Sequence, residues 1–191
     1  PTSGKPPDPA TTVAEADNLC RLVAHHARRL QVGHLERFNP ALAVALERVE
    51  RPRYVRMERS GPFPGRGGDV DVVLELMTHD LDILLHMARA PVESVEAVGW
   101  NVLTGHLDVV SARLRFADGL TADMFASRVG ASRCRRFVVL DALGALEVDL
   151  ASRTVCRTGC GPGDGPAERQ VLDSCDPLLE QDRDFVDVLQ N

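Results

Sequence analysis

Four ionisable side chains in the stretch 69–89 follow one another at helical spacing. Glu75, His79, Asp82 and His86 are separated by four, three and four residues, so a helix would place all four on one face. A histidine beside carboxylates can act as a general acid or base, because its reference pKa of about 6.5 lies near neutral pH and a carboxylate favours the imidazolium. The pattern also fits an amphipathic helix with solvated histidines. A metal site is a third alternative, although helical Glu-x-x-His ligands are spaced by three residues.

The other faces of this helix are apolar, so the rest of the chain must cover them and the ionisable stripe must lie at the edge of a core. Residues 11–27 have the apolar spacing of a helix that Thr11 or Thr12 can cap. The run 29–33 reads as a short strand, and polar residues crowd at its carboxyl end in 34–40. Ligands of open α/β sheets bind at that end of the strands, so this turn is a second part of the candidate site.

The rest of the pattern predicts a sheet. Residues 41–49 read as a helix and 53–59 alternate as a strand, followed by a loop rich in Gly and Pro at 60–68. A closing helix begins at Pro177, after Asp176 as its cap. Between them, strand-like runs separated in part by turn signals are typical of antiparallel hairpins; they are 92–100, 108–116, 120–127, 135–141 and 145–150. We therefore predict an α/β (α+β) fold with an open, mostly antiparallel sheet covered by helices.

Composition and charge narrow the class of protein. The 191 residues carry a formal charge of -6 at pH 7, which argues against a nucleic-acid-binding surface. The run 128–136 is locally basic; it could meet a phosphate, or it could be the solvated face of a strand. No apolar run approaches the ~18–20 residues of a membrane span, and the amino end lacks the pattern of a secretion signal. We expect a cytoplasmic protein without a membrane partner.

The cysteines predict reduced thiols rather than disulfides. There are five of them, an odd number, and they lack paired metal-ligand spacing. Cys156 and Cys160, near Cys175, could in principle hold zinc, but no fourth ligand has a fitting spacing. We therefore expect no metal site.

Three separated blocks resemble the glucose-fructose oxidoreductase / inositol dehydrogenase (Gfo/Idh/MocA) family. They are VGHLERFNPA at 32–41, DVDVVLELMTHDLDILLHM at 69–87 and DVVSARLRFADGLTADMFASR at 108–128. Members join an amino-terminal Rossmann domain to a carboxyl-terminal domain with an open, largely antiparallel sheet. Their cleft holds a Lys from an E-K-P motif and a D-x-x-x-H pair, which correspond here to Lys5 in GKPP and to Glu75 and His79 in ELMTH. The blocks look most like the branch that oxidises the 3-hydroxyl of UDP-N-acetylglucosamine with NAD.

The resemblance implies a division of the chain and a set of roles. Residues 1–35 would be the carboxyl-terminal remnant of a Rossmann domain, and 36–191 a substrate and oligomerisation domain. His79 would be the base or proton relay, Glu75 would orient it, and Lys5 would lie against the reacting hydroxyl. The expected cofactor contacts are Arg37 and Asn39, and the expected sugar or diphosphate contacts are Arg66, Ser127 and Arg128. The plainer alternatives pair Arg37 with Glu36 or Glu58 and leave Arg128 on a solvated strand face.

The cofactor half of such an enzyme is not visible in the sequence. No G-x-G-x-x-G follows a strand, so the chain is expected to be a fragment or a natural truncation, inactive by itself, of an enzyme that uses NAD or NADP. A sugar nucleotide is the expected substrate, and a homo-oligomer formed through the sheet is the expected assembly. The alternative is a non-catalytic sugar-binding or oligomerisation module that kept the sheet and lost the cofactor.

Overall fold

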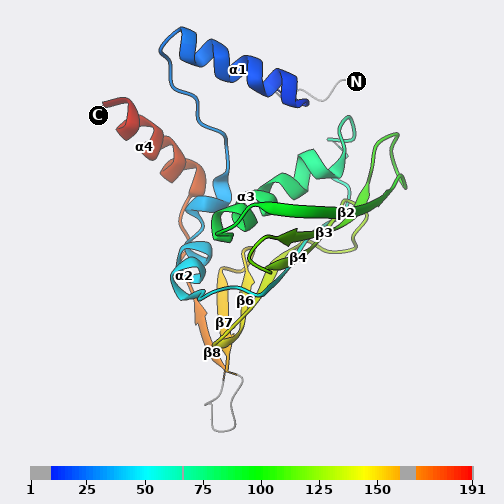
Figure 1. The fold of residues 1–191 in the computed structure, drawn as a ribbon, viewed down its shortest axis with the longest axis vertical. Helices are drawn as coiled ribbons and strands as arrows, with labels where there is room; N and C mark the ends of the chain where they lie inside the picture. The colour runs from blue at the N-terminus through cyan, green and yellow to red at the C-terminus, as the bar shows by residue number, and fades with distance from the viewer. Residues whose placement is uncertain (1–9, 66, 160–166, 191) are drawn as a thin grey trace.

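An eight-stranded sheet forms the body of the protein (Figure 1). The computed structural model describes residues 10–65, 67–159 and 167–190. The strand order is β2-β3-β4-β1-β5-β6-β7-β8, and every pair of neighbours is antiparallel except β1 and β4, which are parallel. The predicted open, mostly antiparallel sheet is confirmed. The strands are β1 Tyr54–Ser60, β2 Val92–Trp100, β3 Val109–Phe116, β4 Thr121–Ser127, β5 Cys134–Asp141, β6 Gly144–Asp149, β7 Thr154–Thr158 and β8 Glu168–Val171.

One face of the sheet carries the hydrophobic core. In β1 the buried residues alternate with more exposed ones, so Val55, Met57 and Arg59 point to the same side. Helix α2, Pro40–Arg48, packs on β6 and β7, and α3, Thr78–Met87, packs on β1. Both helices contribute to one buried cluster with the sheet; its helical members include Leu42, Ala45, Ile83 and Leu84. The core therefore holds α3, which carries the predicted base His79, against the middle of the sheet.

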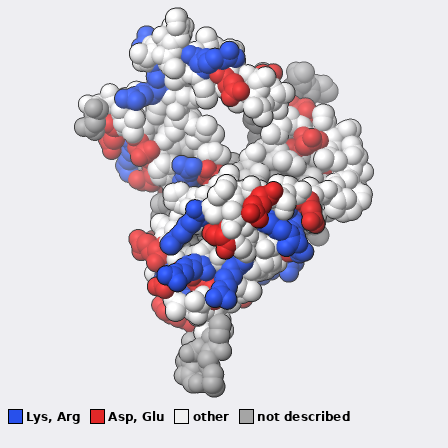
Figure 2. Space-filling view, in the orientation of Figure 1, with Lys and Arg blue, Asp and Glu red and all other residues white. Residues whose placement is uncertain are grey.

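Two further helices flank this body. In α1, Val13–His25, the predicted cap is Thr12, which accepts the N–H of Glu15 while the Glu15 side chain returns to the Thr12 N–H. Helix α4, Pro177–Gln190, is capped as predicted, because Asp176 Oδ1 accepts the N–H groups of Leu178 and Leu179. Figure 2 shows open space between α1 and the body of the molecule. Within the described part of the chain, no helix combines the length and apolar character needed to cross a membrane.

The predicted strand at 29–33 does not form. This segment joins α1 to a short 3-10 helix, η1, at Leu35–Phe38, and it pairs with no strand of the sheet. Its neighbour is instead α4, where Asp184 accepts a hydrogen bond of 2.9 Å from Gln31 Nε2. A strand is stable only when adjacent backbone satisfies its N–H and C=O groups, and here no strand lies beside it among the described residues.

The central helix begins later than predicted and changes type. Residues 68–70 form a turn and a bend, Val73–Met77 is a π-helical turn, and regular α-helix follows from Thr78. The wider turn closes through the Thr78 N–H to the Val73 carbonyl. Such π turns are rare and are frequent at functional sites. The turn lies directly before His79 and contains Glu75.

Candidate active site

A buried ion triad joins three elements beneath the predicted site. Arg59 of β1 donates from Nε and Nη2 to Asp80 Oδ1 of α3, at 3.0 and 2.7 Å. Its Nη1 donates to Glu36 Oε1 of η1 at 2.9 Å. The three side chains are 4%, 6% and 11% exposed, respectively for Arg59, Asp80 and Glu36. Because Arg59 is the main counter-charge of both buried carboxylates, the triad fixes the position of α3 relative to β1 and η1.

His79 lies beside this triad in a form suited to accept a proton. Its Nδ1 is buried and has no hydrogen-bond partner among the described residues. Burial lowers the pKa of His79, and the positive charges of Arg59 and Arg135 lower it further, while Glu36 opposes them. The imidazole is therefore neutral at pH 7. The expectation that neighbouring carboxylates would favour the imidazolium is wrong, because burial and the charge of Arg59 outweigh the carboxylate of Glu36.

A second cluster, made of His34, Arg37 and Asp82, lies next to His79 on the side of η1. The rings of His34 and His79 meet edge to face with centroids 6.4 Å apart. Arg37 donates to both oxygens of Asp82, at 2.8 and 2.5 Å, and His34 Nε2 lies 3.7 Å from the same carboxylate. Burial acts to raise the pKa of Asp82, but the hydrogen bonds from Arg37 hold it below its usual value. Arg37 thus pairs with Asp82 and with neither of the partners, Glu36 or Glu58, that the plainer alternative named.

Glu75 belongs to a different cluster, built around Arg128. The Arg128 side chain is 1% exposed; its Nη1 lies 3.2 Å from Glu75 Oε2 and its Nε lies 3.4 Å from Asp108 Oδ1. It also donates to the carbonyl groups of Gly67, Val70 and Leu107. Arg128 therefore holds the loop before the π turn in place, and the alternative of a solvated strand face is wrong for this residue. Glu75 contacts this arginine and is not among the charges that chiefly shift the His79 pKa.

Asp108 completes that cluster as a buried carboxylate. Its Oδ2 accepts the backbone N–H groups of Val102, Leu103 and Thr104 at 2.7, 2.6 and 2.8 Å. Burial acts to raise its pKa, but these hydrogen bonds hold the pKa well below the usual range for a carboxyl. Asp108 is therefore ionised at all moderate pH values and serves as the counter-charge for Arg128.

The geometry of Gly67 leads to a prediction for this cluster. Gly67 has a φ of 75°, and a Cβ added there would lie 2.0 Å from Glu75 Oε1. Gly67→Ala should therefore lower the free energy of unfolding by about 2 kcal/mol, because it adds left-handed strain and displaces Glu75 from Arg128. Gly65→Ala is the matched control, since Gly65 has a φ of 73° but no atom within 4 Å of its added Cβ. Denaturant unfolding of both variants would check this; equal losses would contradict the role of Glu75.

The remaining predicted site residues are used inside the protein or lie outside the described residues. Asn39 caps α2 through the Ala41 N–H and donates to the Leu150 carbonyl at 3.0 Å. Ser127 Oγ accepts the Val129 N–H at 3.0 Å. Lys5 and Arg66 lie outside the described residues. The structure brings His79 together with His34 and Glu36 of the predicted polar turn 34–40, and with three residues that were not predicted as site residues; they are Arg59, Asp80 and Arg135.

The described part of the chain shows no metal centre. No three His, Cys, Asp or Glu side chains within it come together in a way that could hold a metal ion. Cys20, Cys134, Cys156 and Cys175 are free thiols. Cys160 lies outside the described residues, so the zinc alternative stays a sequence hypothesis.

Comparison with known protein families assigns this arrangement of sheet and helix to a class of oxidoreductase domains. The family model of the GFO/IDH/MocA C-terminal domain matches residues 47–147, which is more than half of the chain. The chain therefore belongs to the GFO/IDH/MocA family, as the resemblance of its three blocks predicted.

Individual relatives agree in fold. UDP-N-acetylglucosamine 3-dehydrogenase of Acidithiobacillus ferrooxidans is 32% identical over 169 residues, which are 88% of this chain and 54% of that protein. A solved structure of that enzyme has a TM-score of 0.84 at 30% identity, covering 96% of this chain and 60% of the relative. An inositol dehydrogenase homologue from Azotobacter vinelandii, complexed with NADH and myo-inositol, has a TM-score of 0.70 at 15% identity, covering 84% and 47%, which shows the fold alone. The chain spans about half the length of the curated relative that it matches.

Proposed function

We propose that this chain is the substrate-side part of an NAD(P)-dependent dehydrogenase that oxidises the 3-hydroxyl of UDP-N-acetylglucosamine. The observation that carries the proposal is His79, a neutral imidazole with a buried Nδ1 that has no hydrogen-bond partner among the described residues. Such a group can take the proton of a substrate hydroxyl. The name of the relative from Acidithiobacillus ferrooxidans supports the choice of sugar nucleotide and position.

The charges around His79 suit the removal of a hydroxyl proton. When the proton moves to His79, negative charge develops on the hydroxyl oxygen, and the nearby Arg59 and Arg135 stabilise that charge. Their guanidinium groups stay charged throughout, so they need no proton of their own to act. The family resemblance places Lys5 against the reacting hydroxyl and makes Glu75 the residue that orients His79. Both roles remain proposals. For Glu75, its contact with Arg128 favours a role in holding the loop at 67–70.

The described residues do not fit the dinucleotide itself. Pyrophosphate binding in these folds uses free N–H groups at a helix amino terminus. Here the amino ends of α1, α2 and α4 are capped by Thr12, Asn39 and Asp176, and α3 continues from the π turn. The nicotinamide, when a dinucleotide-binding domain holds it, supplies the hydride acceptor. This chain's residues would orient the sugar and move the proton.

The proposed domain boundary near residue 35 is consistent with the packing. Helix α1 has no buried residue, whereas Glu36 and Asn39 already belong to the buried part of the chain. The apolar side chains of Leu30 and Val32 are 55% and 64% exposed. We propose that 1–35 is the carboxyl-terminal part of a Rossmann dinucleotide-binding domain, as the family resemblance implies.

Two titrations and one assay test the function. The 191-residue chain should bind UDP-N-acetylglucosamine weakly and should not bind NAD or NADP in the micromolar range, because no helix end is free for the pyrophosphate. Expressed together with a dinucleotide-binding domain of the family, it should reduce NAD or NADP in the presence of this sugar nucleotide. Micromolar NAD binding by the chain alone would show that the cofactor site is misplaced. No turnover with any UDP-sugar in the joined protein would overturn the function.

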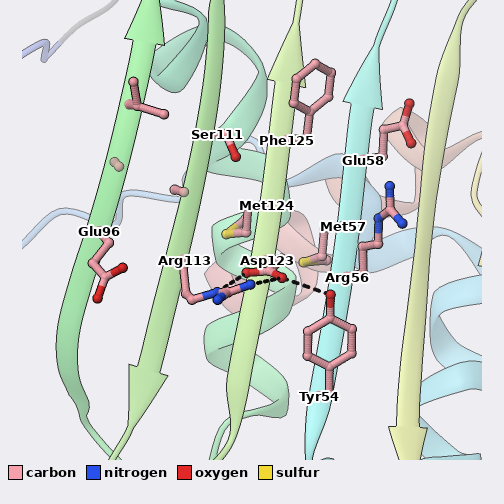
Figure 3. Close-up of a pocket in the computed structure, with 13 residues that line it drawn as sticks. Tyr54, Arg56, Met57, Glu58, Glu96, Ser111, Arg113, Asp123, Met124 and Phe125 are labelled. Atoms are coloured by element: carbon pink, nitrogen blue, oxygen red, sulfur yellow. Dashed lines mark hydrogen bonds and ion pairs between the residues drawn. The ribbon is translucent and has the colours of Figure 1, made fainter.

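A self-association module is the second candidate function, because the other face of the sheet is open. Figure 3 shows Tyr54, Arg113 and Asp123 on adjacent strands of this face. These residues line a concavity of about 710 Å³. Asp123 accepts from Arg113 Nε and Nη2 at 2.6 and 2.7 Å and from the Tyr54 hydroxyl at 2.9 Å. The same face carries Phe125, 38% exposed. We infer that a second copy covers this face, since mixed charges around an apolar centre can pair with themselves across a two-fold axis.

Sedimentation at micromolar concentration should show an oligomer. Phe125→Glu should shift the chain toward monomer, because it places a charge in the centre of the contact. Leu143→Glu is the matched control: Leu143 is 49% exposed in the turn between β5 and β6, away from this face. A monomeric wild-type chain would refute the assembly.

A further inference from the structure

A cavity of about 440 Å³ opens next to the buried ion triad, where β5, the turn between β6 and β7, and the start of α4 meet. Three arginines line it, Arg133, Arg135 and Arg153, together with Glu36 and Asp176. We propose that this cavity binds the diphosphate of the nucleotide-linked sugar, with the three arginines as its cationic ligands. The inference rests on the proposed function for the identity of the sugar, and on the charges in the cavity for the identity of the anion.

The carboxylates of the cavity already have partners. Glu36 is shared by Arg59 at 2.9 Å and Arg135 at 3.4 Å. Asp176 Oδ1 caps α4 by accepting two backbone N–H groups. Neither acid therefore meets Arg133 or Arg153, and among the described residues these two arginines form no ion pair within 4.0 Å. The cavity has more positive charge than its own acids neutralise.

Two further observations indicate an anion site. Arg153 Nε is buried and has no acceptor among the described residues, which is costly for a donor unless a ligand or water supplies one. Burial lowers the pKa of Arg135, and the neighbouring charges of Arg59 and Arg133 lower it further. Cations held this close repel one another, and a bound anion relieves that repulsion. Planar guanidinium groups also match phosphate oxygens with paired hydrogen bonds.

The place of the cavity fits a sugar nucleotide. Glu36 and Arg135 both line the cavity, and the charges of both act on the pKa of His79, so the anion site and the proposed base are electrostatic neighbours. A diphosphate held here would put the sugar attached to it toward His79.

The arginines of the basic run 128–136, which the sequence indicated as a possible phosphate contact, lie in three different environments. Arg133 and Arg135 line the cavity, Arg128 is buried in the loop cluster, and Arg136 is exposed and outside the cavity.

Calorimetric titration of the 191-residue chain with UDP, pyrophosphate, uridine and N-acetylglucosamine tests the assignment. UDP and pyrophosphate should bind, uridine and the free sugar should bind far more weakly, and UDP affinity should fall as salt is raised. The double variant Arg133→Gln/Arg153→Gln should lose about tenfold or more in UDP affinity, because each charged hydrogen bond to phosphate contributes strongly. Arg136→Gln is the control, because Arg136 is an exposed arginine of β5 outside the cavity, and its affinity should stay within about twofold of the wild type. Thermal unfolding midpoints would confirm that both variants are folded.

The outcomes separate this inference from the proposed function. Unchanged UDP affinity in the double variant, equal binding of uridine and UDP, or no binding of either anion at millimolar concentration would overturn the diphosphate site. Loss of UDP binding in the double variant, in a protein that shows no sugar oxidation, would leave the anion site standing and the oxidation refuted. In the joined protein, oxidation with an unchanged KM in the double variant would overturn the anion site alone. If the double variant does not fold, Arg133→Gln by itself, at an exposed position, should give a smaller loss of the same kind.

Discussion

His79→Ala, in a protein that joins this chain to a dinucleotide-binding domain, should lower kcat by about a hundredfold to ten-thousandfold and change KM much less. A positioned base contributes to the transition state rather than to binding, so its loss appears in turnover. The structure supports this role through the lowered pKa of His79 and its buried Nδ1 without a partner among the described residues. His86→Ala is the matched control, because His86 belongs to the same helix and is exposed. If both substitutions lower kcat equally, His79 is not the base and its helix is an ordinary amphipathic helix with solvated histidines.

The pH dependence of turnover gives an independent check on His79. Only the unprotonated imidazole can accept a proton, so kcat should fall as the pH drops through the pKa of His79, which lies below 6.5. Arg135 lowers that pKa, so Arg135→Gln should move the acidic limb toward higher pH. A limb above pH 6.5 in the wild-type protein would mean that carboxylates outweigh burial and the arginines at this site.

Glu75→Gln separates the base from the cluster that supports its helix. Glu75 contacts the buried Arg128, so the substitution should weaken the hold on the loop at 67–70 more than it changes the proton transfer. Its effect on kcat should therefore be smaller than that of His79→Ala.

Much of the fold follows from local pattern. Alternation of buried and exposed residues in β3 and β4, and the turn at 117–119, were sufficient to predict a hairpin. The parallel pairing of β1 with β4 was not predictable in this way, because these strands are far apart in sequence and only the packing of the core brings them together. β7 and β8 were missed because they are short and polar. Their strand conformation is stabilised by the pairing of β7 with β6 and of β8 with β7, which the local sequence does not reveal.

The site was only partly predictable for a related reason. Helical spacing identified His79, but the charges that set its pKa come from β1, η1 and β5, which no local pattern joins. One signal was present in the sequence: Arg59 stands in the same alternating phase as Val55 and Met57, so a buried arginine that needs carboxylate partners could have been inferred. The partner on α3, Asp80, stands next to His79 but lies off the ionisable stripe, so the helical spacing did not single it out.

Arg59→Ala should lower the free energy of unfolding by about 3–5 kcal/mol, the second large effect that the structure predicts. The guanidinium is the shared partner of Asp80 and Glu36 in a region where little water reaches them, so its removal leaves two carboxylates buried without their main counter-charge. Chemical denaturation followed by circular dichroism measures this loss directly.

The design of this experiment separates lost charge pairing from lost packing. Arg56→Ala is the matched control, because Arg56 is exposed on the opposite face of the same strand and should change stability by about 0.5 kcal/mol or less. The double variant Arg59→Met/Asp80→Leu removes both charges of the closest pair and fills the space with apolar atoms, so it should be more stable than Arg59→Ala. If Arg59→Ala costs no more than Arg56→Ala, the triad does not hold α3 on the sheet. In that case the position of His79 must be maintained by the apolar contacts of Ile83 and Leu84 alone.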